Sequence, residues 1–164
     1  MKNNKRPLKK TSISSGLSRI KRYFEAQHQP IIVEDKGAFT VKDFLEGDPV
    51  NINLHFMNMP QFKSILVQVS SDRFYAFETQ RELFHLVNHL DEHACIIKYP
   101  TDELSGSLQL TRLYSYREIN SMEISHLIAE MVGDYVKSEA MVNKVANGKS
   151  VAEASDEPSG SETE

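Results

Sequence analysis

The sequence lacks several features on which common protein classes depend. It has one cysteine, Cys95, so no disulfide can form within the chain. No stretch approaches the roughly 18 uninterrupted apolar residues of a membrane-spanning helix. The basic start of the chain also lacks the apolar segment of a secretory signal. We therefore expect a soluble cytoplasmic protein with no membrane span.

An excess of basic charge is also missing. Lys and Arg number 19 against 23 Asp and Glu, which gives a net charge of −4. Nucleic-acid-binding proteins normally carry a basic field, so this balance argues against nucleic acid as a main partner. Five basic residues and no acid lie between Met1 and Lys10. A nucleic-acid accessory protein that uses this basic N-terminal tail is therefore kept as an alternative, beside a tail that only aids solubility.

The motifs of common enzymes are absent. The seven glycines form no GxGxxG or GxxxxGK phosphate-binding loop, and there is no GxSxG nucleophile turn or His-Glu-x-x-His metal motif. No pair of carboxylates has a spacing that suggests acid–base chemistry. We expect a protein that is not an enzyme, with no catalytic residues and no cofactor.

The composition that is present is that of an ordinary globular domain. Hydrophobic residues make up 40% and charged residues 26% of the chain, enough to build one core without disulfides or metal. Both ends are poor in large apolar residues and differ in charge. We predict a basic disordered tail over residues 1–13, one domain over residues 14–147, and an acidic disordered tail over residues 148–164.

The periodicity of apolar residues predicts the fold class. Residues 50–57 and 64–69 alternate apolar and polar side chains with the period of two that is typical of strands with one packed face. Further strands are expected at residues 31–33, 38–44, 94–99 and 108–114, and helices at about 15–27, 79–94 and 120–147. The order α-β-β-β-β-α-β-β-α predicts an α+β, two-layer domain: an antiparallel sheet with helices packed on one face.

The middle of the chain, from Leu17 to Val142, resembles the YbjN family, whose fold is similar to that of class I type III secretion chaperones. The resemblance lies in Tyr23-Phe24 at the end of the first helix, in Ile32-Val33-Glu34, in Met59-Pro60, in the stretch Arg81-Glu82-Leu83-Phe84-His85-Leu86-Val87-Asn88-His89-Leu90, and in Ile96-Ile97-Lys98-Tyr99. It implies a small bacterial protein, often a homodimer, that binds other proteins or regulates them. The related chaperones hold an extended client segment around their surface.

A partner surface is expected on the side of the sheet that the helices leave uncovered. A sheet face or a free edge strand can bind an extended segment of another polypeptide, and Leu66 interrupts the polar pattern of this face. The alternative is a face that only contacts water. The residues predicted for this face are Asn51, Asn53, His55, Ser64, Leu66, Gln68, Gln109 and Thr111.

Three histidines, His85, His89 and His93, are spaced four apart on the expected second helix. This spacing places them along one side, roughly opposite an apolar face of Leu83, Val87 and Leu90. Imidazoles one turn apart can bind a metal such as zinc, so a metal-binding protein is a second alternative. The same pattern also fits a solvated polar face or a pH-sensitive contact surface.

Overall fold

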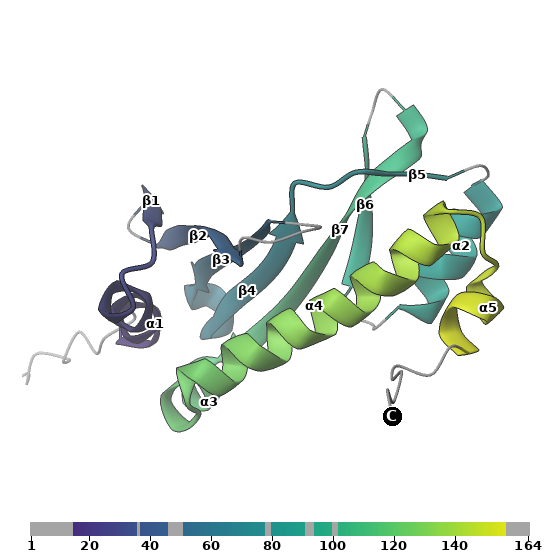
Figure 1. Cartoon of the computed structure of the whole chain (residues 1–164). Helices are drawn as coiled ribbons and strands as arrows, with labels where there is room; N and C mark the ends of the chain where they lie inside the picture. Colours follow the sequence, from purple (N-terminus) through teal and green to yellow (C-terminus); the bar gives the residue numbers. More distant parts are fainter. Residues whose placement is uncertain are drawn as a thin grey trace, which may run out of the picture.

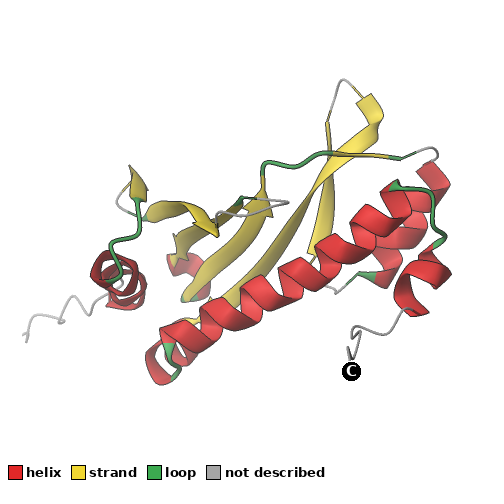
Figure 2. Ribbon diagram, viewed as in Figure 1, coloured by secondary structure: helices red, strands yellow, loops and turns green. Residues whose placement is uncertain are grey.

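The structure is a layer of helices packed against one antiparallel sheet (Figures 1 and 2). It is a computed structural model that describes residues 15–35, 37–45, 51–77, 80–90, 94–99 and 102–156. The α+β fold predicted from the periodicity is confirmed. The elements in chain order are α1 (Ser15–Ala26), β1 (Ile31–Asp35), β2 (Ala38–Leu45), β3 (Ile52–Met59), the 3-10 turn η1 (Pro60–Phe62), β4 (Ser64–Ser71), β5 (Tyr75–Ala76), α2 (Gln80–His89), β6 (Ala94–Tyr99), β7 (Asp102–Ser115), α3 (Tyr116–Ser121), α4 (Ile124–Ala146) and α5 (Val151–Asp156).

The first four strands of the sheet form a meander, and the long strand β7 follows them in the strand order. Strands β1, β2, β3 and β4 pair in sequence order, and β7 then pairs with β4. On its other side, β7 forms a hairpin with β6, while the short β5 pairs with β7 beyond the end of β4. All of these pairings are antiparallel. Residues that are partners across neighbouring strands have their side chains on the same face of the sheet.

One continuous hydrophobic core lies between the sheet and the helices. Alternate residues of β3 and β4 point into it, as their sequence periodicity predicts. Helix α1 contributes Phe24, whose ring lies 5.6 Å from that of Phe56, and Phe56 in turn stacks on Phe39 at 4.9 Å between centroids. Helix α4 crosses the strands obliquely and buries Leu127, Met131 and Tyr135 (Figure 2). Both helices therefore cover the same face of the sheet.

Helix α4 is held on the sheet by ion pairs as well as by apolar contact. Arg112 of β7 points toward the helix, and its two terminal nitrogens each lie 2.7 Å from a carboxylate oxygen, one of Glu130 and one of Asp134. Its side chain is largely buried, so two charge-assisted hydrogen bonds compensate for the removal of the guanidinium from water.

The structure adds three elements to the predicted order: β5, α3 and α5. The prediction that residues 148–164 form a disordered tail is wrong for Val151–Asp156, which forms α5. Ala154 is buried against the core, and Ser150 and Glu153 exchange hydrogen bonds at the start of this helix. Val151 also packs against the core, so these small apolar contacts and a helix cap order a segment that composition alone assigned to the tail. The predicted basic tail, residues 1–13, lies outside the described residues.

We predict that Phe56→Ala lowers the free energy of unfolding by about 3–5 kcal/mol, because it leaves a cavity between Phe24 and Phe39. The neighbouring Met57 is exposed on the other face, and Met57→Ala should cost less than about 1 kcal/mol. Urea denaturation of both variants measures the difference. Equal losses would contradict the one-sided core.

The start of α3 makes stability depend on pH. The Ser115 hydroxyl accepts from the Glu118 backbone N–H at 3.2 Å, while a Glu118 carboxylate oxygen accepts from the Ser115 N–H at 2.7 Å. Hydrogen bonds from the side chain and backbone of Ser115 lower the pKa of Glu118 below its ordinary value. The stabilisation by ionised Glu118 is therefore complete above the pKa of the unfolded chain, near 4.3, and is lost as the pH falls through the folded pKa.

We predict that Ser115→Ala costs about 1 kcal/mol at pH 7 and less at pH 3. Glu118→Gln, which has no carboxylate to titrate, should make the effect of Ser115→Ala independent of pH over this range. Denaturant titrations at both pH values test this with four chains: the unaltered chain, Ser115→Ala, Glu118→Gln and the double variant. A Ser115→Ala cost that does not change with pH in the otherwise unaltered chain would refute the role of Glu118.

Candidate functional site: the open sheet face

The candidate site is the side of β3, β4 and β7 that points away from α4, here called the open face. None of the helices among the described residues covers it, and its side chains are exposed or half-buried. Strand register arranges these side chains in three cross-strand rows: Asn53–Ser70–Gln109, Thr40–His55–Gln68–Thr111 and Met57–Leu66–Leu113. The open face therefore has two polar rows beside one apolar row.

The structure brings together most of the side chains predicted for this face. Asn53, His55, Leu66, Gln68, Gln109 and Thr111 all lie in the three rows. Asn51 is exposed just before β3 begins. Ser64 does not belong to the surface, because its side chain is buried and its hydroxyl donates to the Phe62 carbonyl at 2.8 Å.

Two members of the apolar row, Met57 and Leu113, were not predicted for this face. Leu113 is 50% exposed, and Met57 is exposed beside the half-buried Leu66. The sequence pattern places Met57 on this face, because Met57 occupies a position of β3 that alternates with the core residues. What the sequence did not show is that β7 is in register with β4, which places Leu113 opposite Leu66.

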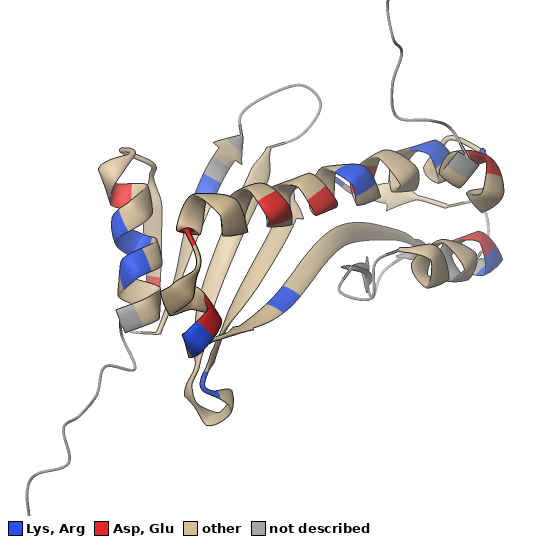
Figure 3. Ribbon diagram, turned by 90° about the horizontal axis from the view of Figure 1, so that it is seen from below, with Lys and Arg blue, Asp and Glu red and all other residues tan. Residues whose placement is uncertain are grey.

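The centre of the open face carries no formal charge. Strands β3 and β4 contain no Asp, Glu, Lys or Arg. From Gln109 to Ser115, β7 has only Arg112, which points to the helix side. In Figure 3 most of the coloured charges accordingly lie on helices rather than on strands. Depletion of charge is the compositional signal of the centre of a protein interface.

A hydrogen-bonded chain fixes the ring of His55 at one side of this face. The Thr40 hydroxyl oxygen lies 2.6 Å from a Glu34 carboxylate oxygen and 2.9 Å from His55 Nδ1. An ionised carboxylate only accepts hydrogen bonds, and a threonine hydroxyl has a single proton. That proton is therefore donated to Glu34, and the Thr40 oxygen accepts from Nδ1–H of His55. In the neutral ring, Nε2 then keeps its lone pair and can accept a hydrogen bond from a bound group.

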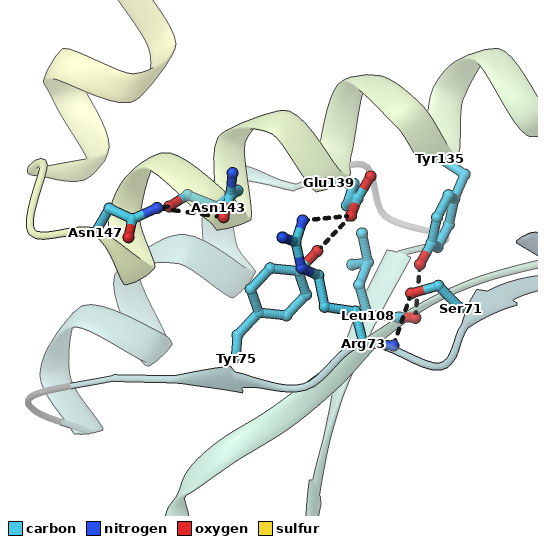
Figure 4. A network of polar contacts seen from close by, with 8 residues as sticks. All are labelled: Ser71, Arg73, Tyr75, Leu108, Tyr135, Glu139, Asn143 and Asn147. Carbon is cyan, nitrogen blue, oxygen red and sulfur yellow. Dashed lines mark hydrogen bonds and ion pairs between the residues drawn. The ribbon is translucent and has the colours of Figure 1, made fainter. Parts of the chain in front are cut away.

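A second group of titratable side chains is buried between the sheet and α4 (Figure 4). Glu139 is 8% exposed and accepts from the Tyr75 hydroxyl at 2.7 Å and from Arg73 at 3.4 Å. Burial, reinforced by Glu139, raises the pKa of Tyr75 well above its usual range, and burial raises that of Tyr135 to about 12. Both phenols thus stay protonated and act as donors. The cluster holds the segment between β4 and β5 on α4, which is a structural role.

The predicted metal ligands do not form a site in the part of the chain that is described. His85 and His89 are both exposed on α2, and His93 lies outside the described residues. The Arg81 Nε–H donates to His85 Nε2 at 3.5 Å, which places a cation beside one candidate ligand. The described residues contain no group of three or more His, Cys, Asp or Glu that could hold a metal ion. Of the predicted apolar face, Leu90 is buried, but the prediction is wrong for Val87, which is exposed while the neighbouring Leu86 is buried.

Among the helices that the structure describes, none is long and apolar enough to cross a membrane. Comparison of the chain with protein-family models, curated proteins and solved structures gave no match. The function must therefore be inferred from the open face itself.

We predict that neutral His55 is the tautomer protonated at Nδ1, because Thr40 and Glu34 accept from that atom in sequence. Long-range ¹H–¹⁵N spectra of the imidazole rings measure this directly. His126, exposed on α4, serves as the reference ring. A neutral His55 ring protonated at Nε2 would show that the chain of hydrogen bonds does not form.

Proposed function

We propose that this chain is a non-catalytic, cytoplasmic protein-binding module, chaperone-like or regulatory, that engages another polypeptide on its open sheet face. The observation that carries the proposal is the combination found there: an apolar row, two neutral polar rows, and no covering helix among the described residues. Apolar side chains supply the favourable burial, while amide and hydroxyl groups can pair with the backbone of a bound segment.

The size of the face favours a short segment or a transient partner. Three strands about 4.8 Å apart and eight residues of about 3.4 Å each cover roughly 400 Å² of flat area. A standard protein interface buries about 800 Å² on each partner. The three rows are thus sufficient for an extended peptide and would supply only part of the interface with a globular domain.

Charge and hydrogen bonding narrow the choice of partner. Because the face has no formal charge at its centre, a bound segment with a charged side chain there would lose hydration without gaining an ion pair. Partner residues that are apolar or neutral polar are therefore favoured. His55 Nε2 adds a preference for a hydrogen-bond donor, such as a hydroxyl or an amide N–H, next to the apolar row.

The resemblance to the YbjN family is consistent with this proposal. The fold of that family is similar to that of chaperones that hold extended client segments. We include a homodimer in the proposal on the same basis, with the partner-binding residues Asn51, Asn53, His55, Leu66, Gln68, Gln109 and Thr111 on each copy. No cofactor or catalytic group is part of it.

We predict that Leu113→Lys abolishes partner binding while leaving the fold intact, because the side chain is half exposed and a lysine there puts a charge into a neutral face. Val136→Lys is the matched control, since Val136 is 45% exposed on α4 and lies off the sheet. The measurement is quantitative mass spectrometry of proteins that co-purify with each chain from its own cells.

Partners that are retained by the unaltered chain and by Val136→Lys but lost with Leu113→Lys support the proposal. Partners retained equally by all three chains would place binding elsewhere. Light scattering of the same samples shows whether Leu113→Lys changes the oligomeric state, which separates loss of a client from loss of self-association.

A further inference from the structure

Strand β1 is a free edge of the sheet, and its Ile32 is the cross-strand partner of Thr40, at the end of one row of the open face. It stands at one end of the strand order and pairs only with β2 among the described strands. Backbone N–H and C=O groups on the outer side of such a strand can pair with an added strand. Ile32 is 46% and Val33 56% exposed, so apolar side chains are available on both faces of this edge.

A cavity lies directly beside this edge on the helix side. It has a volume of about 210 Å³. Its lining combines four apolar residues with three polar or charged ones: Leu17, Val33, Ala38 and Phe39, and Ser18, Lys21 and Asp35. Small-molecule sites usually measure about 300–1,000 Å³, so this cavity is too small for such a ligand. It is suited instead to a single side chain inserted from the neighbouring strand position.

The two ends of β1 differ in charge, which favours one orientation of a strand bound beside it. Its first three residues are apolar, and its last two are Glu34 and Asp35, both exposed. Asp35 accepts from the Gly37 N–H, a neutral donor, and Glu34 accepts from the Thr40 hydroxyl. Glu34 also lies 3.3 Å from His55 Nδ1, which carries a charge only when the ring is protonated, so with a neutral His55 ring both carboxylates keep their negative charge. The nearby Lys21 is already 3.7 Å from Glu25 on its own helix. The end of β1 is therefore an acidic position suited to a basic group.

We propose that β1 accepts an extended segment of another polypeptide as an additional antiparallel strand, with an apolar side chain in the cavity and a basic residue toward its N-terminal end. Antiparallel addition places the N-terminal end of the new strand beside Glu34 and Asp35 and continues the pattern of the whole sheet. Every second side chain of the new strand then lies on the helix side, next to Val33 and the cavity. Backbone pairing supplies affinity, and the cavity and the acidic end supply selectivity. This edge site does not depend on binding at the open face.

The test uses a synthetic β-forming peptide with leucine at the cavity position and lysine at its N-terminal end. Binding is measured by fluorescence anisotropy, and amide hydrogen exchange locates it on the chain. We expect slower exchange within Ile32–Glu34 when the peptide binds. Methylation of the backbone nitrogens that face β1 should weaken binding about tenfold or more, because each methyl group removes a hydrogen bond. Moving the lysine to the C-terminal end of the peptide should also weaken it.

A pair of protein variants tests the cavity. Ser18→Leu fills it, whereas Arg22→Leu changes an exposed residue of the same helix that does not line it. In the unaltered chain and in Arg22→Leu, replacing the peptide leucine by alanine should reduce affinity. In Ser18→Leu this difference in affinity should disappear. A double-mutant cycle that combines the protein change with the leucine-to-alanine change in the peptide measures this coupling.

Equal binding of the methylated peptide, or protection on β3, β4 and β7 instead of β1, would overturn the proposal. It would also be overturned if the β1 amides become protected without peptide as the protein concentration rises, because a second copy would then occupy the edge. The variant Leu113→Lys distinguishes the two sites: it should leave peptide binding at β1 unchanged even where it abolishes binding on the open face.

Discussion

Burial of only one face of the sheet is the constraint on which the rest of this structure depends. In a strand, successive side chains point to opposite faces, so alternation of apolar and polar residues assigns one face to the core. In β3 and β4 the core face is sealed by α1 and α4. Burial of large aliphatic and aromatic side chains there contributes about 1.5–3 kcal/mol each, more than any surface ion pair of the molecule contributes. The side chains of the other face do not contribute to this core and remain exposed or half-buried.

The polar contacts of the helix side reinforce this arrangement. Arg112 pairs with two carboxylates on α4, and Glu139 of the same helix accepts from Tyr75 and Arg73. These contacts set the position of α4 along the sheet, which apolar packing alone specifies less well. Loss of one partner would leave a buried charge or hydroxyl unpaired, so the contacts favour a single placement of the helix. A fixed helix layer keeps the three rows of the open face in constant geometry.

Sequence periodicity was sufficient for the fold class and for most of the open face, because a period of two can be read without knowing which strands are neighbours. The Glu34–Thr40–His55 chain could not be predicted, since it depends on the register of β1, β2 and β3. The Tyr75–Glu139 bond joins residues 64 positions apart and leaves no local pattern. The cap of α3 is different: Ser115 and Glu118 have capping-box spacing, but the strand pattern before them obscured it. On α2, Leu86 rather than Val87 is buried, because tertiary packing selected between two neighbouring apolar stripes.

The two proposed binding surfaces use different groups of the same sheet. The open face presents side chains, while the β1 edge presents the backbone, with a cavity beside it. The two surfaces adjoin at β1, where Ile32 is the cross-strand partner of Thr40 and Glu34 accepts from the Thr40 hydroxyl. Because one surface binds through side chains and the other through backbone groups, occupation of one does not require occupation of the other.

The central claim, that one face of the sheet is sealed and the other is open, is tested most directly by solvent paramagnetic relaxation of side-chain methyl groups. A soluble paramagnetic probe should strongly relax the methyl groups of Met57 and Leu113 and leave those of Leu54 and Val67 almost unaffected. Protection of Met57 and Leu113 in the isolated chain, to the degree seen for Leu54, would show that the face is covered and would contradict the account.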